Sequence, residues 1–283
     1  WWGRRCGSRD HPGGRGIDHD HLGAGCLLGR DASKVSIELF DVEKAFGKTQ
    51  VLNRLTLTIH EGQTVSIIGG SGSGKSTALK HMVGLLRPDA GEVYVDEQNV
   101  SRLDQESLYQ LRRNVGYVFQ FAALFDSMTI AENVGMGLKR MPDMSGDAID
   151  QRVSECLQMV DLEGTAEKLP SELSGGQRKR AGFARAIATR PKYMLYDEPT
   201  TGLDPVTTAV IDELIVRMSD ELGVTGVVIT HDMKSAFRIS DRIAMLYHGG
   251  IRFEGTPDEL RMCEDPVVKG FIEGRPKLMR LAP

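Results

Sequence analysis

A glycine-rich loop lies between a short apolar run and a helical pattern. It reads Gly69-Gly70-Ser71-Gly72-Ser73-Gly74-Lys75-Ser76-Thr77, which matches GxxxxGK[ST]. Glycines allow backbone N–H groups to turn toward phosphate oxygens, and the N-terminus of the following helix adds partial positive charge. We expect Lys75 to reach the β- and γ-phosphates of a nucleotide and Ser76 to bind Mg²⁺ through its hydroxyl. The loop therefore predicts a nucleotide site that also holds Mg²⁺.

Two carboxylates follow another apolar run, Tyr193 to Tyr196. Asp197, at the end of this predicted strand, can hold Mg²⁺, and Glu198 can orient the water that attacks a γ-phosphate. A solvated acidic pair after a strand is the alternative, and in isolation it explains the pattern equally well. Because a phosphate loop is present, we interpret Asp197 as a metal ligand and Glu198 as a catalytic residue.

A further anion site is predicted at Leu173-Ser174-Gly175-Gly176-Gln177, which precedes a helical run from Arg178 to Thr189. Ser174 and the N–H groups of the two glycines stand at a helix start, where anions bind favourably. One chain does not need two sites for a γ-phosphate. The economical explanation is a head-to-tail homodimer, in which this site serves the nucleotide of the second copy.

These motifs together resemble the ATPase subunits of ABC transporters. The resemblance extends from about residue 35 to residue 260, and LSGGQ combined with DEP is highly specific to that family. It rests on the loop at 69–77, LSGGQ at 173–177, YDEPTTGLDP at 196–205 and His231. The resemblance implies ATP hydrolysis, with ATP and Mg²⁺ as cofactors.

The resemblance also assigns roles to single residues. Gln120 is implied to contact Mg²⁺ or water, and His231 to contact the γ-phosphate, so both join Glu198 and Lys75 as catalytic residues. Two more residues are implied to bind the nucleotide: Asp204 at the dimer interface, and Phe46, where the family places an aromatic that stacks on adenine. An aromatic in a turn can instead simply be packed.

The elements that must position these residues follow from apolar periodicity. Short apolar runs bounded by glycine or polar residues suit strands buried on both faces of a parallel sheet. Such runs are Val65–Ile68, Val115–Phe119, Tyr193–Tyr196 and Val227–Ile229. Apolar stripes at helical spacing are Ile149, Val153, Leu157 and Val160, and then Ile211, Leu214, Ile215, Met218 and Leu222. Alternating strands and helices predict an α/β fold with right-handed crossovers.

Residues 34–260 are thus predicted to form an ABC ATPase domain, a P-loop NTPase core with a mainly parallel sheet. The strand patterns Val35–Val42 and Val51–Ile59 bracket a turn at 46–48 and would form an antiparallel β subdomain. The region from about 122 to 189 has helical patterns without a convincing strand. It is predicted to be an inserted helical subdomain.

Residues 1–33 are rich in glycine, hold both tryptophans and show no apolar periodicity. We predict that this N-terminal extension is disordered, because it cannot bury enough apolar surface to offset the entropy of ordering. Metal binding is an alternative there, although the spacings match no familiar site. The residues concerned are Cys6, His11, His19, His21 and Cys26. The other two cysteines lie far away, which argues against a disulfide scaffold.

The composition narrows the possible partners. A formal charge of −4 gives no basic excess, so nucleic acid is not expected as a partner. The sequence contains no apolar run approaching the ~18 to 20 residues that span a bilayer. We expect a peripheral protein on the cytoplasmic face of the inner membrane. The family resemblance implies that it binds an integral membrane permease there.

The segment FQFAALFDSMTIAENV, residues 119–134, is the most informative for partner choice. About half of its apolar residues are expected to lie in the core. The others are expected to line a groove that binds a helix of the permease. The string resembles ATPases of Mla/Mce-type lipid transporters, which implies phospholipid transport between membranes and an Mce-type lipid-binding partner. An importer ATPase for an amino acid or an anion shares every catalytic motif. A non-transport ABC ATPase would carry long coiled coils or two cassettes, and this sequence has neither.

The C-terminal extension, residues 261–283, is predicted to carry a short helix. Asp265 is a good N-cap, Pro266 suits the first helical position, and Gly274 can end the helix. The apolar stripe of this helix is Val267, Val268, Phe271 and Ile272. The stripe must dock either on its own domain or on the neighbouring subunit. The resemblance to Mla/Mce ATPases favours the neighbouring subunit.

Overall fold

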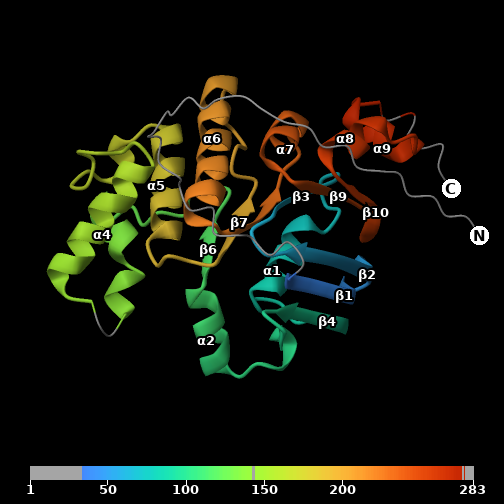
Figure 1. Ribbon diagram of the computed structural model, residues 1–283, viewed down its shortest axis with the longest axis horizontal. Coiled ribbons are helices and arrows are strands. Elements are labelled where there is room, and N and C mark those ends of the chain that lie inside the picture. The colour runs from blue at the N-terminus through green and yellow to red at the C-terminus, as the bar shows by residue number, and fades with distance from the viewer. Residues whose placement is uncertain (1–33, 142–143, 276, 278–283) are drawn as a thin grey trace, which may run out of the picture. The chain divides into compact units, whose positions relative to one another are not determined.

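The computed structural model in Figure 1 describes residues 34–141, 144–275 and 277. The disorder predicted for residues 1–33, and the alternative of metal binding there, lie outside the described residues. Within the described ranges, no helix combines the length and the apolarity that crossing a bilayer requires.

A six-stranded sheet carries the strands that end at the candidate site. Its order is β10-β9-β3-β8-β7-β6, and all neighbours pair in parallel except β10, which runs antiparallel to β9. The strands are β3 (Thr64–Ile68), β6 (Val115–Val118), β7 (Tyr193–Asp197), β8 (Thr225–Ile229), β9 (Arg242–Tyr247) and β10 (Gly250–Gly255). Every residue of β3 and β8 is buried, as expected for strands covered on both faces. The apolar runs predicted as strands are confirmed.

A second sheet is antiparallel and has four strands in the order β2-β1-β4-β5. Its strands are β1 (Val35–Phe46), β2 (Thr49–His60), β4 (Ala90–Val95) and β5 (Gln98–Asn99). The first two strands are longer than their sequence patterns predicted. Register shifts along β1 interrupt the apolar alternation on which those predictions depended.

Nine α-helices occur among the described residues, with short 3₁₀ turns at Val100–Arg102, Leu138–Arg140 and Pro170–Glu172. They are α1 (Lys75–Met82), α2 (Gln105–Arg113), α3 (Ile130–Gly135), α4 (Gly146–Met159), α5 (Gly175–Ile187), α6 (Pro205–Leu222), α7 (Met233–Ile239), α8 (Pro257–Met262) and α9 (Pro266–Ile272). Within the region 122–189, α3, α4 and α5 share one apolar cluster with α6. The predicted stripes of α4 and α6 point into this cluster: Val153 is 4% exposed and Leu214 is 1% exposed.

Helix α9 packs on its own domain. Val267 and Val268 are fully buried in a cluster that includes Ile68 of β3 and Met245 of β9, and Phe271 packs against the same cluster. Asp265 caps the helix and also bonds Arg252 of β10 at 2.8 Å. The expectation that this stripe docks on a neighbouring subunit is therefore wrong. The face of the sheet over β3 and β9 offers an apolar surface within the same chain, at a lower entropic cost than association.

Candidate nucleotide-binding site

The predicted phosphate loop follows β3 and opens α1. Gly69 and Gly74 have φ angles of 150° and 105°. A Cβ at Gly69 would lie 2.4 Å from the Leu246 carbonyl oxygen, so only glycine fits there. Lys75, Ser76 and Thr77 form the first turn of α1. The sequence pattern and the fold therefore agree on a loop that leads into a helix N-terminus.

The ammonium group of Lys75 lies inside this loop. Its Nζ donates hydrogen bonds to the carbonyl oxygens of Gly69 and Gly70, each at 2.9 Å, and the residue is 6% exposed. Burial lowers the pKa of Lys75, while the charges of Glu198 and Asp197 act in the opposite direction. A bound phosphate would likewise favour the charged ammonium, so the loop suits an anionic ligand.

Ser76 and Asp197, both predicted as metal ligands, lie together. The Ser76 hydroxyl donates to one Asp197 carboxylate oxygen at 2.9 Å, and the Tyr117 hydroxyl donates to the other at 3.2 Å. A hydroxyl and a carboxylate are hard oxygen donors, the kind that Mg²⁺ prefers, and Mg²⁺ usually completes its shell with water and phosphate oxygens. The residues present therefore fit Mg²⁺. Sequence reasoning did not identify Tyr117, because its role depends on the pairing of β6 with β7.

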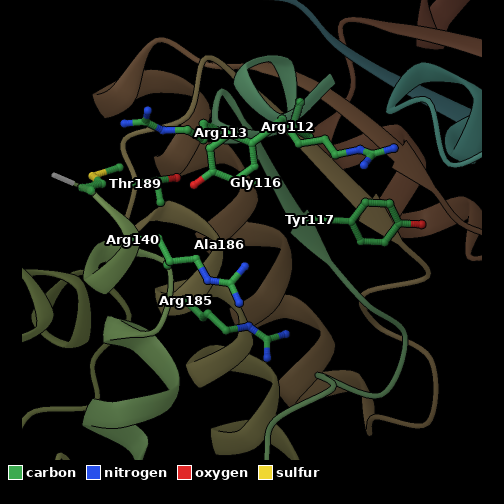
Figure 2. A pocket seen from close by; sticks show the side chains of 12 residues that line it. Arg112, Arg113, Gly116, Tyr117, Arg140, Arg185, Ala186 and Thr189 are labelled. Atoms are coloured by element: carbon green, nitrogen blue, oxygen red, sulfur yellow. The ribbon is translucent and has the colours of Figure 1, made fainter. Parts of the chain in front are cut away.

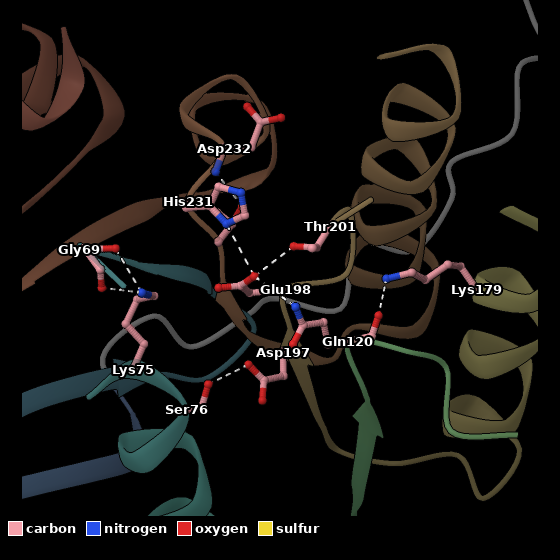
Figure 3. Close-up of polar contacts among 12 residues, drawn as sticks. Gly69, Lys75, Ser76, Gln120, Lys179, Asp197, Glu198, Thr201, His231 and Asp232 are labelled. Carbon is pink, nitrogen blue, oxygen red and sulfur yellow. Dashed lines mark hydrogen bonds and ion pairs between the residues drawn. The ribbon is translucent and has the colours of Figure 1, made fainter. Parts of the chain in front are cut away.

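Glu198 stands at the centre of the polar groups in Figure 3. Its Oε2 accepts a hydrogen bond from Thr201 Oγ1 at 2.8 Å and lies 3.5 Å from Gln120 Nε2. His231 Nδ1 is 3.4 Å from the same oxygen. The backbone of Glu198 has a φ of 50°, and its N–H donates to the Ile229 carbonyl at the end of β8. The predicted catalytic residues Gln120 and His231 thus both lie close to the carboxylate of Glu198.

Thr201 and Lys179 also belong to this group, and sequence reasoning did not single them out. Thr201 lies in the YDEPTTGLDP motif, three residues after Glu198, where a turn returns its hydroxyl to the carboxylate. Lys179 is 7% exposed, and its Nζ donates to the Gln120 carbonyl oxygen (Figure 3). No local sequence signal identifies Lys179, because the contact joins residues 59 positions apart.

The predicted anion site at 174–177 bonds within its own helix. Ser174 is the N-cap of α5: its Oγ accepts from the Gln177 N–H at 3.3 Å, and the Gln177 side chain accepts from the Ser174 N–H at 2.9 Å. Gly175 and Gly176 form the first turn. A Cβ at Gly176 would lie 2.7 Å from Thr207 Cγ2, so glycine allows α6 to approach closely.

Asp204 and Phe46 occupy surface positions. Asp204 caps α6 by accepting from the N–H groups of Val206 at 2.9 Å and Thr207 at 3.0 Å. Phe46 ends β1 and is 49% exposed, with the Lys44 ammonium 5.8 Å from its ring centre. The aromatic face of Phe46 is therefore accessible to a ligand, and its role as an adenine platform stays a prediction.

Known proteins resemble this sequence over most of its length. The sequence pattern of the ABC transporter family matches residues 52–201. The Arabidopsis thaliana protein TRIGALACTOSYLDIACYLGLYCEROL 3, chloroplastic, is 41% identical, over 86% of this chain and 74% of its own length. The probable ribonucleotide transport ATP-binding protein mkl of Mycobacterium leprae is 37% identical, over 87% of this chain and 71% of its own length. The sulfate/thiosulfate import ATP-binding protein CysA of Caulobacter vibrioides is 40% identical, over 84% of this chain and 70% of its own length.

Solved structures resemble the fold as well. The dimeric ATP-binding cassette MJ0796, in a post-hydrolysis state bound to ADP and Pi, superposes with a TM-score of 0.72. It is 39% identical, and the match covers 78% of this chain and 98% of that one. The likeness confirms the predicted P-loop NTPase fold class.

Proposed function

This chain belongs to the ABC transporter family, and we propose that it powers lipid transport through a membrane permease. It is the ATP-binding subunit, it binds ATP with Mg²⁺, and it hydrolyses ATP. Two observations support lipid as the cargo. A relative that is 41% identical is named after a glycolipid, and residues 119–134 resemble the corresponding segment of Mla/Mce-type ATPases.

The arrangement around Glu198 supports specific roles in hydrolysis. Ser76 and Asp197 would hold Mg²⁺, which, when bound, neutralises charge on the β- and γ-phosphates. Glu198 would accept a proton from the attacking water, because its carboxylate is held by Thr201 and lies next to Gln120. The other roles that we propose are contacts to ATP: His231 and Lys75 would contact phosphate, Phe46 would contact adenine, and Gly69–Thr77 would surround the phosphates.

The site within one chain is incomplete under this proposal. Ser174 caps its own helix, and under this proposal it serves the γ-phosphate that a second copy holds. We therefore propose a head-to-tail homodimer, with Ser174–Gln177 and Asp204 at the interface. A related cassette has been solved as a dimer, which supports this arrangement.

The permease would dock beside the loop that carries Gln120. Phe119, Phe121 and Phe125 are 42%, 83% and 49% exposed, and such adjacent apolar side chains indicate an interface. Next to them is a pocket of about 260 Å³, shown in Figure 2. The Phe119 ring lies 4.4 Å, centre to centre, from that of Tyr117, which lines the pocket. Arginines that line it are Arg112, Arg113, Arg140 and Arg185.

The proposed assembly places this subunit on the cytoplasmic face of the inner membrane, under a permease that works with an Mce-type lipid-binding protein. A decisive test is reconstitution of the complete complex in proteoliposomes that contain fluorescent phospholipid. We expect ATP-dependent transfer of the labelled lipid and no transfer with Glu198→Gln. ATP-driven movement of another solute, without lipid transfer, would contradict the lipid proposal.

An importer of a small anion is the second candidate. It is favoured by the 40% identity to a sulfate/thiosulfate import protein, which shares the same family. The same proteoliposomes, supplied with radiolabelled sulfate in place of labelled lipid, distinguish the two candidates.

A further inference from the structure

The loop that carries Gln120 is held by one face of α5. Lys179 donates a hydrogen bond from Nζ to the carbonyl oxygen of Gln120. Six residues further along the helix, the guanidinium of Arg185 donates to the carbonyls of Ala122 at 2.8 Å and Ala123 at 2.6 Å. Three backbone carbonyls of one short loop thus bond to two side chains of one helix.

The loop between these contacts has an unfavourable backbone. Ala122 and Ala123 have φ angles of 58° and 49°, a region that residues with a Cβ rarely adopt. Such a conformation persists only where the surroundings fix it. The guanidinium of Arg185 supplies part of that constraint, since its planar fork matches two carbonyl oxygens at once.

Close packing supplies the rest of the constraint. Gly182 lies on α5 between Lys179 and Arg185, and a Cβ there would lie 3.4 Å from the Cα of Ala122. Ala122 is 3% exposed. The helix and the loop are therefore in contact along the whole stretch between the two bonded side chains.

Lys179 is an unusual residue to find at such a contact. It is 7% exposed, and burial lowers the pKa of its ammonium, while the charge of Glu198 acts in the opposite direction. Burying a charge is costly unless hydrogen bonds compensate for the lost water. The hydrogen bond to Gln120 is the compensation observed here, so the buried ammonium and the position of Gln120 depend on each other.

We propose that Lys179 and Arg185 clamp the Gln120 loop to α5, and that Lys179 is a positioning residue for ATP hydrolysis. The clamp fixes the backbone of Gln120, whose side-chain amide lies 3.5 Å from the Glu198 carboxylate. Because Ser174 caps the start of α5, a displacement of that helix by a second copy would carry the Gln120 loop with it. This inference rests on the roles proposed above for Gln120, Glu198 and Ser174.

The test compares three replacements of one lysine. Lys179→Met keeps the length of the side chain and removes the donor, Lys179→Arg keeps a charged donor, and Lys179→Gln keeps a neutral one. We expect Lys179→Met to lower kcat about tenfold with the Kd for ATP changed less than about twofold, since misplacement of ~1 Å can cost ~10²-fold. Lys179→Arg should recover most of the rate. Lys168→Met, at an exposed lysine of the helical region, is the matched control.

Hydrogen exchange of the loop amides provides an independent readout. Lys179→Met and Arg185→Met should each accelerate exchange at residues 119–125, whereas Lys168→Met should not. If Lys179→Met retains the wild-type kcat, or weakens ATP binding as much as it lowers kcat, the positioning role is wrong. Should the Met variant fail to fold, the same comparison is made between the Arg and Gln variants and the wild type.

These measurements distinguish a failure of the clamp proposal from a failure of the proposed function. Glu198→Gln measured alongside reports whether the assigned carboxylate acts in hydrolysis at all. Full activity of Glu198→Gln would overturn the proposed site itself. Loss of activity in Glu198→Gln, with unchanged kcat in Lys179→Met, would overturn only the clamp.

Discussion

The hydroxyl of Ser76 lies 2.9 Å from the carboxylate of Asp197, although 121 positions separate the two residues in the sequence. Parallel strands explain the contact. Ser76 stands in the first turn of α1, which follows β3. Asp197 ends β7, and both strands pair with β8 between them. The carboxyl ends of parallel strands meet at one edge of a sheet, which is where ligands bind in such folds.

Asp197→Asn should raise the Mg²⁺ concentration needed for half-maximal ATPase activity by at least about tenfold, because loss of even an indirect metal contact typically costs ~10- to 100-fold in affinity. Titration of activity with Mg²⁺ at saturating ATP measures the effect. Asp258→Asn is the control, since that side chain is 82% exposed. An unchanged Mg²⁺ requirement would remove Asp197 from the metal site.

Glu198→Gln should preserve ATP binding and lower turnover by ~10²- to 10⁴-fold, the usual contribution of a positioned general base. The amide keeps the shape of the side chain but cannot accept the proton of the attacking water. Single-turnover hydrolysis and ATP binding are measured separately, with exposed Glu221→Gln as the control. Turnover within about threefold of the wild type would contradict the role.

Mixing Lys75→Ala chains with Ser174→Arg chains should restore activity that neither variant shows alone. In a head-to-tail dimer, one composite site of the mixed pair receives an intact Lys75 and an intact Ser174. Absence of recovery would count against the shared site, although strict coupling of the two sites gives the same result. Crosslinking of a photoreactive ATP to the opposite chain resolves that ambiguity.

Asp212 should make the stability of the domain dependent on pH. Burial raises its pKa to about 6 from an ordinary 3.8; the Ser235 hydroxyl at 3.0 Å and Arg238 oppose this shift, while Asp232 and Glu213 reinforce it. Because the folded-state pKa lies above the unfolded value, the folded protein binds the proton more tightly. The contribution of Asp212 to the free energy of unfolding is therefore greatest below about pH 4 and is lost as the pH rises through 6.

The variant Asp212→Asn tests this dependence. It should raise Tm at pH 8 by about 4 to 8 °C, which corresponds to about 2 kcal/mol after allowance for partial solvation, and should have little effect at pH 5. Exposed Asp150→Asn serves as the control at both pH values. An equal gain in Tm at pH 5 and pH 8 would show that titration of Asp212 is not the cause.

The C-terminal helix should stabilise the single chain. Val268→Ala removes apolar contacts of a fully buried side chain and should lower the free energy of unfolding by about 1 to 2 kcal/mol. Sedimentation should show unchanged self-association. Met262→Ala, at a residue 72% exposed, is the control. Weaker association of Val268→Ala at an unchanged Tm would restore the idea of docking on the neighbouring subunit.

Local sequence patterns predicted the parts of the site that each depend on one short segment. The loop at 69–77 and the strand before Asp197 have strong signals, because glycine spacing and continuous apolar runs act over a few residues. Strands β9 and β10 were not predicted. A tight turn at His248 and Gly249, both at positive φ, joins them and was a local signal for the pair. The contact of Lys179 with Gln120 and the docking of Val268 depend on tertiary packing, which no local pattern records.

The reciprocal cap at Ser174 has a further consequence for assembly. A serine hydroxyl is both an acceptor and a donor, and the cap uses only its acceptor side, toward the Gln177 N–H. The hydroxyl hydrogen remains available for an incoming anion without any change in the cap. In the proposed dimer, the phosphate would therefore bind to a serine whose side chain is already held by its cap. Association would then cost less entropy of ordering at this position.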